Sequence, residues 1–151
     1  MSVFQRILVP VDGSDPSNAA VELGLRLAKE WTSELIFCNI VDTDRIMAES
    51  ASVVTGGDPT PIIETMLASG EQLLSAASKE AKSAGLSTRT CLQREGNPVK
   101  GILDLAKREH VDLVMMGSHG RGGLSLLVMG STTEGVLRSS EVPVLVVRER
   151  R

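Results

Sequence analysis

The chain has 151 residues, of which 42% are hydrophobic and 23% charged, and its net charge is −3. This length suits a single domain over residues 1–151 with a sizeable core, and the composition is too apolar for general disorder. Two phenylalanines, one tryptophan and no tyrosine, with a mildly acidic balance, argue against a nucleic-acid partner, which would need stacking rings or a basic footprint.

Neither the N-terminus nor any later stretch predicts a membrane segment. No run approaches the ~20 apolar residues of a membrane-spanning helix, and residues 1–13 lack the pattern of a signal peptide. We therefore expect a cytoplasmic protein with no membrane partner. Cys38 and Cys91 stand far apart among apolar neighbours, which predicts two buried thiols, and neither has metal-ligand spacing with His110 or His119.

The first third of the chain predicts a strand, a helix and a second strand. RILVPV, residues 6–11, is an apolar run, and GSDPS follows it with candidate N-caps in Ser14 and Asp15 and with Pro16 in a first-turn position. Apolar residues then recur at helical spacing up to Trp31, and residues 33–42 form a second apolar run. Such alternation is typical of βα units around a parallel sheet that is buried on both faces.

The remaining elements continue this alternation after one irregular stretch. Residues 43–60 show no clean period, so we expect a loop there with at most a short helical turn. A long helix is predicted over 62–84 with Gly85 as its stop, followed by a mixed polar strand over 86–94 near a sheet edge. Asn97 and Pro98 then start a helix, 111–116 is a buried strand, 132–138 a short helix, and 142–148 a strand that Pro143 places at an edge.

The segment GSHGRGGLSLLVMGSTTE, residues 117–134, follows the buried strand directly. Glycines let backbone amides approach a ligand closely, and in open parallel sheets ligands bind beyond the carboxyl ends of the strands. STTE at 131–134 matches a capping box in which Ser131 caps the helix and Glu134 reaches back. The helix start adds free N–H groups and a positive dipole end, so we expect an anion cradle for phosphate.

The segment matches neither of two common phosphate-binding loop motifs. A Walker loop requires Lys and Ser or Thr after its final glycine, whereas Gly117 to Gly122 is followed by Gly123 and Leu124. The dinucleotide fingerprint requires glycine or alanine where Ser125 stands. Because the lysine that steadies a transferring phosphate is absent from the segment, holding a nucleotide is favoured over cleaving it.

The spacing Gly117, two residues, Gly120, nine residues, Gly130 and Ser131 resembles the nucleotide loop of the universal stress protein family in its ATP-binding, UspA-like type. The resemblance spans the chain. It includes PVDGS at 10–14, NIVD at 39–42, EGNP at 95–98, DLVMMGSHGRGG at 112–123 and PVLVV at 143–147.

The resemblance implies an α/β, flavodoxin-like (Rossmann-like) three-layer sandwich with a five-stranded parallel sheet of order 3-2-1-4-5. It also implies a stress-response regulator that binds ATP or AMP, with Mg²⁺ at Asp12 when ATP is bound, and a homodimer through the last strand, Val142 to Val147. No catalytic residue is assigned. The implied cofactor-binding residues are Pro10, Val11, Asp12, Val41, Met116, Gly117, His119, Gly120, Arg121, Gly130, Ser131, Thr132 and Thr133.

Two alternative functions stay open at this point. The first is a slow ATPase or self-phosphorylating enzyme that uses Asp12 and Mg²⁺ with a loop hydroxyl as acceptor. The second is a dimeric interaction module that binds no nucleotide.

Four apolar residues around the irregular stretch have no assigned role. They could form a partner surface, a core or a lid over the nucleotide, and the regulatory partner is unassigned. These residues are Met47, Ile62, Ile63 and Met66.

Overall fold

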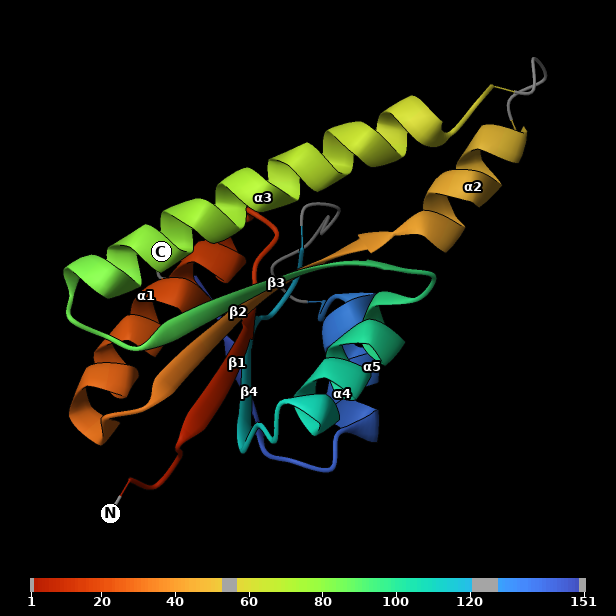
Figure 1. Ribbon diagram of the computed structural model, residues 1–151. Helices are drawn as coiled ribbons and strands as arrows, with labels where there is room; N and C mark the ends of the chain where they lie inside the picture. Colours follow the sequence, from red (N-terminus) through yellow and green to blue (C-terminus); the bar gives the residue numbers. More distant parts are fainter. Residues whose placement is uncertain (1, 53–56, 121–127, 150–151) are drawn as a thin grey trace.

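The computed structural model describes residues 2–52, 57–120 and 128–149, and its centre is one five-stranded parallel sheet in the order β3-β2-β1-β4-β5. This order and the helices on both faces confirm the α/β, flavodoxin-like class with strand order 3-2-1-4-5 (Figure 1). The strands are β1 (Arg6–Pro10), β2 (Glu34–Asp42), β3 (Thr88–Glu95), β4 (Leu113–Gly117) and β5 (Val144–Val147).

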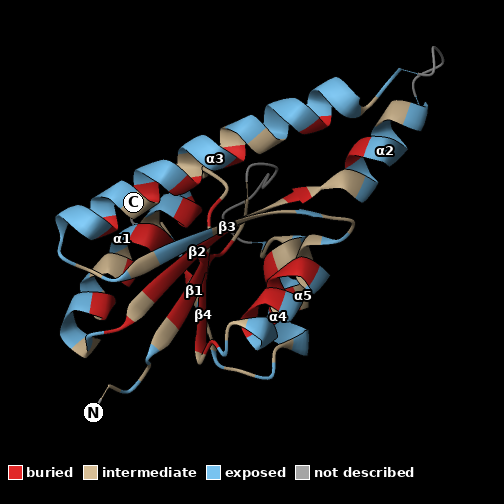
Figure 2. Ribbon diagram, viewed as in Figure 1, coloured by how far each residue is buried: buried red, intermediate tan, exposed pale blue. Residues whose placement is uncertain are grey.

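Helices cover the sheet on both sides, because each buried strand alternates its side chains between two apolar layers. On one side α1 (Asp15–Trp31) and α3 (Thr60–Ser83) pack on a cluster that contains Ile7, Val9 and Phe37. On the other side α4 (Pro98–Arg108) and α5 (Ser131–Ser139) pack on a cluster that contains Leu8 and Ile36. Figure 2 shows the buried residues gathered along the sheet and on the inner faces of these helices.

Local signals set the helix ends where the sequence predicts them. The Ser14 side chain accepts a hydrogen bond from the amide of Ser17 and caps α1. The side-chain oxygen of Asn97 accepts from the amides of Val99 and Lys100 and caps α4. Gly85 follows α3 with a φ of 75°, a left-handed conformation that glycine adopts without steric cost. Both predicted edge strands, β3 and β5, lie at sheet edges.

Residues 43–52 correct the expectation of a loop, because they form the helix α2 (Thr43–Ser52). Only Ile46 of α2 is buried, so its apolar periodicity is weak and local pattern reasoning misses it. One local and one tertiary hydrogen bond hold the start of α2. The Arg45 amide donates to the Asp42 carboxylate three residues earlier, and the Thr43 hydroxyl donates to the Glu95 carbonyl oxygen on β3. The helix projects from the sheet beside the start of α3 (Figure 1).

The expectation that both cysteines are buried needs correction. Cys38 is fully buried, but Cys91 is only partly buried because it lies on the edge strand β3. No helix within the described residues is long and apolar enough to cross a bilayer.

Candidate functional site

A cavity of about 660 Å³ opens beyond the carboxyl ends of the parallel strands. It is lined by residues from β1, β2, β4, α2, α3 and the start of α5. Every predicted cofactor-binding residue lines it except Arg121, which lies outside the described residues. Those that line it are Pro10, Val11, Asp12, Val41, Met116, Gly117, His119, Gly120, Gly130, Ser131, Thr132 and Thr133.

Asp12 is held in a fixed orientation at the end of β1. Its Oδ1 accepts hydrogen bonds from the amide of Ser14 at 2.9 Å and from the hydroxyl of Ser14 at 2.6 Å. Its own amide donates to the Ser17 hydroxyl at 3.1 Å. The other carboxylate oxygen, Oδ2, lies where a side chain on Gly120 would stand, only 2.7 Å from an ideal Cβ. Within residues 2–52, 57–120 and 128–149 no group donates a hydrogen bond to Oδ2, and this oxygen faces Gly120.

Two glycines allow backbones to meet at the floor of the cavity. A Cβ on Gly117 would lie 2.7 Å from the carbonyl carbon of Pro16 and 2.8 Å from the amide nitrogen of Ser17. A Cβ on Gly130 would lie 3.0 Å from the Cα of His119. These close approaches explain why side chains are missing at both positions: β4 meets the start of α1, and the chain entering α5 meets the chain leaving β4.

Not all amides of the predicted cradle are available to a ligand. The Ser118 amide donates to the Val147 carbonyl oxygen, and the Gly130 amide donates to the Ser118 carbonyl oxygen, both at 2.8 Å. The Thr133 hydroxyl donates to the Gly117 carbonyl oxygen at 2.8 Å. These bonds join β4, β5 and α5 into one rigid corner, and they leave the first turn of α5 as the source of free N–H groups.

The predicted capping box at 131–134 is wrong. Gly130 occupies the N-cap position of α5 in an extended conformation, and no side-chain hydrogen bond caps the helix. The amide bond to Ser118 and the contact with His119 fix Gly130 there, so Ser131 becomes the first helical residue. Glu134 pairs with Arg138 one turn later instead of reaching back. The Ser131 hydroxyl is thus not used as a cap and lines the cavity.

The cavity lining also contains residues that are not among the predicted cofactor-binding residues. Asn39 of β2 donates its side-chain N–H to the Val11 carbonyl oxygen at 2.8 Å. Gly70 of α3 lies against it, since a Cβ there would come within 2.4 Å of the Asn39 Oδ1. Glycine is unfavourable inside a long helix, and asparagine is unfavourable inside an apolar strand. These two unusual residues were the features of the sequence from which this contact could have been predicted.

The charged side chains that line the cavity are few. Asp12, Asp42 and Arg45 contribute their charges, and no lysine lines the cavity among the described residues. His119 lies beside Ser118, with 3.1 Å between its Nδ1 and the Ser118 hydroxyl. Cys38 also lines the wall, but burial raises the pKa of its thiol so strongly that it stays protonated. Within the described part of the chain no group of three His, Cys, Asp or Glu side chains could hold a metal ion by itself.

Known proteins resemble the chain over nearly its whole length. The model of the universal stress protein family matches residues 4–148. Universal stress protein YxiE of Bacillus subtilis is 33% identical over 152 residues, which cover 97% of this chain and all of that protein. The solved structure of MJ0577, a universal stress protein of Methanocaldococcus jannaschii, superposes with a TM-score of 0.81 at 25% identity, covering 97% of each chain.

A second solved structure carries information about a ligand. It is a universal stress protein in complex with cAMP, and it superposes with a TM-score of 0.68 at 25% sequence identity. The match covers 99% of this chain and all of the other.

Proposed function

Because the chain belongs to the universal stress protein family, we propose that it is a regulatory protein that binds ATP or AMP in the cavity at the carboxyl ends of β1 and β4. The base would lie toward Val41 and the ribose beside Val11 and Asp12. The phosphates would lie at the first turn of α5, near Gly130 and Ser131.

The single observation that carries this proposal is the convergence of three segments on one cavity. Three segments that are far apart in the sequence line the same space of about 660 Å³: residues 10–12, four residues of 116–120 (all but Ser118), and residues 130–133. That volume lies within the range of small-molecule sites, roughly 300–1,000 Å³. At its phosphate end the cavity meets a helix start without a side-chain cap, where free amides and the helix dipole favour an anion.

The similar structure in complex with cAMP supports an adenine nucleotide over other ligands. An apolar wall is available for a base here, since Val41 and Ile46 are buried and line the cavity. Asn39 and Ser69 line the same wall and offer side-chain donors and acceptors to a base or ribose.

Mg²⁺ fits this arrangement only together with a bound nucleotide. A protein site for Mg²⁺ in nucleotide complexes uses one or two carboxylates plus phosphate oxygens and water. Asp12 has one carboxylate oxygen held by Ser14 and one directed to Gly120, so Oδ2 would take the ion. When bound, the ion would screen the charge of the phosphate chain.

Hydrolysis or self-phosphorylation is the alternative, with Ser131 or Thr132, which line the cavity, as hydroxyl acceptors. The cavity lining supports it weakly, because the described residues contribute no lysine to it and fast phosphoryl transfer relies on such cations. Turnover of ATP that disappears in an Asp12→Ala variant with intact binding would move the protein to this class.

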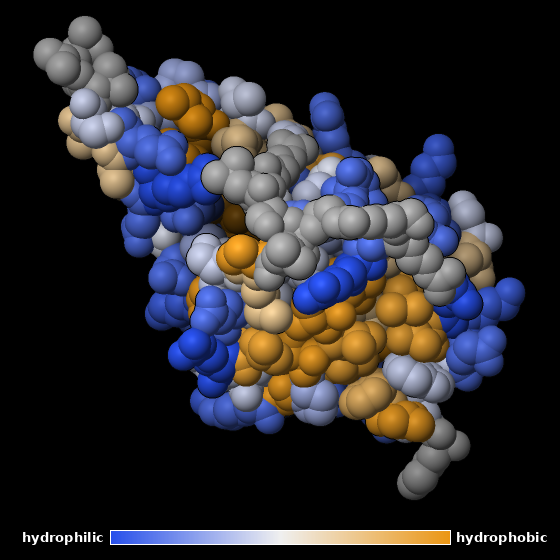
Figure 3. Space-filling view, turned by 180° about the vertical axis from the view of Figure 1, so that it is seen from behind, coloured by the Kyte–Doolittle hydropathy of each residue, from blue (hydrophilic) through white to orange (hydrophobic). Residues whose placement is uncertain are grey.

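We further propose that two chains associate through their last strands. β5 is an edge strand, and Leu145 on it and Leu137 on α5 are exposed apolar side chains. Figure 3 shows a broad apolar patch on the side of the molecule seen from behind. A patch of this kind usually marks an interface. Light scattering of the purified protein tests this, and Leu145→Glu should produce monomers.

Calorimetry with ATP, AMP, cAMP and NADH tests nucleotide binding, each with and without Mg²⁺. We expect saturable binding of at least one adenine mononucleotide with one site per chain. Binding of NADH alone would contradict the proposed ligand class. A protein that responds to none of the four, in calorimetry and in thermal melts at millimolar ATP, would support the module that binds no nucleotide.

A further inference from the structure

A second cleft lies away from the nucleotide cavity, between α3 and the edge strand β3. Its volume is about 860 Å³. Leu74 and Leu92 contribute apolar surface, and the polar lining includes the hydroxyls of Ser75, Ser78 and Thr90. None of its lining residues belongs to the proposed nucleotide site.

The strand beside this cleft has an unpaired edge. β3 stands at the end of the sheet order and pairs only with β2 within the described residues. The pairing runs in unbroken register from Thr88 to Glu95, so no bulge interrupts β3. An edge of this kind presents a row of backbone donors and acceptors that can pair with another strand.

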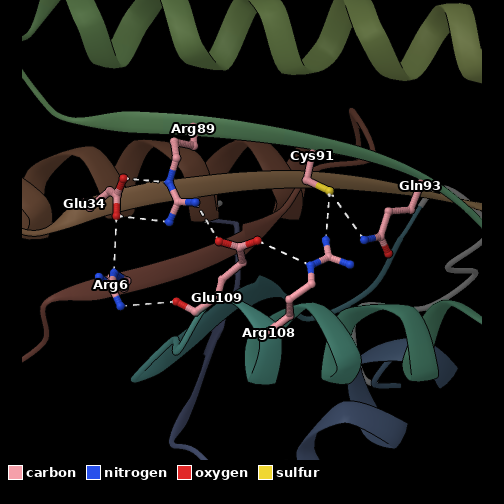
Figure 4. Close-up of polar contacts among 7 residues, drawn as sticks. All are labelled: Arg6, Glu34, Arg89, Cys91, Gln93, Arg108 and Glu109. Atoms are coloured by element: carbon pink, nitrogen blue, oxygen red, sulfur yellow. Dashed lines mark hydrogen bonds and ion pairs between the residues drawn. The ribbon is translucent and has the colours of Figure 1, made fainter.

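The two faces of β3 differ in how far their side chains are engaged. Arg89, Cys91 and Gln93 point toward the α4 side, where Arg89 pairs with Glu34 and Glu109 (Figure 4). Thr90 and Leu92 point the other way and line the cleft. On the α4 side, a strand added beside β3 would therefore lie next to charged side chains that are already paired. On the α3 side it would lie next to the open cleft.

The charges of the cleft select the kind of strand that fits. Lys79 and Lys82 line it from α3, against a single acid, Glu71. Neither lysine takes part in an ion pair among the described residues. A second β3 from another copy of this chain would bring the same lysines with it, and like charges disfavour that pairing.

We propose that the β3 edge and the α3 cleft form a docking site for an extended, acidic segment of a partner protein. The segment adds a sixth strand to the sheet beside β3, and its acidic side chains face Lys79 and Lys82. Backbone pairing gives the affinity, and the two lysines give the preference for acidic sequences. The docking site shares no lining residue with the proposed nucleotide cavity.

An acetylated and amidated octapeptide of four Val-Glu repeats provides a direct probe, because it alternates acidic and apolar faces along an extended strand. We expect fluorescence anisotropy of the labelled peptide to show saturable binding to the full-length protein. A peptide of four Val-Lys repeats should bind at least tenfold more weakly. Protection of β3 amides from hydrogen exchange upon addition of the Val-Glu peptide should locate the contact.

The double variant Lys79→Glu with Lys82→Glu should weaken binding of the Val-Glu peptide about tenfold, since two exposed charge pairs become repulsive. The matched control is Lys29→Glu with Lys107→Glu, which changes the net charge equally on α1 and α4. Urea unfolding of both doubles verifies that each is folded. The control should bind the peptide within about twofold of the natural protein.

Backbone pairing is tested apart from charge by methylating alternate amide nitrogens of the Val-Glu peptide. One of the two possible methylation patterns should abolish binding, because it blocks the hydrogen-bonding edge without altering any side chain. Equal binding of both methylated peptides, equal effects of the two lysine doubles, or no binding of the Val-Glu peptide at 1 mM would each overturn the proposal.

Discussion

The two ends of the sheet are built in opposite ways. At the amino end, Arg89 donates to Glu34 at 2.8 Å and to Glu109 at 2.6 Å, and Arg6 lies 3.5 Å from Glu34 (Figure 4). The Asp112 carboxylate accepts hydrogen bonds from the neighbouring amides of Gln5 and Arg6. These charged groups at the amino end therefore find partners within the protein, whereas the buried hydroxyl of Thr88, at the start of β3, has none among the described residues.

The carboxyl end is built from glycine backbone around a cavity. Gly117, Gly120 and Gly130 let chain segments meet without side chains, and α5 begins there without a side-chain cap. A helix start leaves its first amides without intrahelical partners. The nucleotide site that we propose at the carboxyl end therefore depends less on reactive side chains than on the first backbone amides of α5.

Gly117→Ala should break the carboxyl end most severely. Its Cβ would stand 2.7 Å from the backbone of Pro16, and neither buried segment can move away easily. We expect a loss of about 3 kcal/mol in the free energy of unfolding, the upper range for overpacking, measured by urea denaturation. Gly57→Ala is the control, because nothing lies within 4 Å of its Cβ, and it should change stability by under about 0.5 kcal/mol. Equal stability of the two variants would contradict the close contact.

Thr133→Val should cost less, because it removes one buried hydrogen bond without changing the side-chain shape. The carbonyl oxygen of Gly117 loses its 2.8 Å donor, so we expect a loss of about 2 kcal/mol in unfolding free energy. Thr132→Val serves as the matched variant for denaturation and should be nearly neutral. A neutral Thr133→Val would show that the bond between α5 and β4 does not stabilise the corner.

Gly120→Ala should separate ligand binding from stability. Among the described residues the new Cβ would meet only the carboxylate of Asp12, whose Oδ2 would lie 2.7 Å away. That short side chain would have to turn out of the orientation in which Ser14 holds it. Stability should change by less than about 1 kcal/mol, while the displaced carboxylate should weaken binding of ATP with Mg²⁺ about tenfold, or about 1.4 kcal/mol. Calorimetry and urea denaturation measure the two effects. Unchanged affinity would remove Asp12 from the proposed site.

Glu109→Gln should have the smallest effect and should leave nucleotide binding unchanged, since it alters the amino end alone. The hydrogen bond from Arg89 lowers the pKa of the Glu109 carboxyl below its ordinary value of 4.5. Its contribution to stability is therefore present above pH 4.5 and is lost as the pH falls through the lower folded-state pKa. At pH 7 we expect the variant to lose under about 1 kcal/mol of unfolding free energy, and this loss should shrink as the pH falls below 4.5. Urea denaturation at several pH values measures the change. A constant difference at all pH values would contradict this origin.

The sequence predicted the fold well because its signals are local. Strands β1, β2 and β4 are apolar runs, and the caps at Ser14 and Asn97 and the stop at Gly85 act within a few residues of the helix ends. The spacing of Gly117, Gly120 and Gly130 in the sequence also pointed to segments that line the cavity. The helix α2 was missed, because one buried residue, Ile46, leaves no period to detect.

Taken by itself, the sequence determined the order of the elements, the two edge strands and the segments that would meet at the carboxyl end. The tertiary structure decided which backbone and side-chain groups at that end form hydrogen bonds within the protein. Gly130 rather than Ser131 became the N-cap of α5, and the amides of Ser118 and Gly130 donate to carbonyl oxygens of the protein itself. It also brought Gly70 against Asn39 and opened the cleft beside β3. The reason is distance along the chain, because local preference fixes a residue's conformation whereas its hydrogen-bond partners come from segments that only folding brings together.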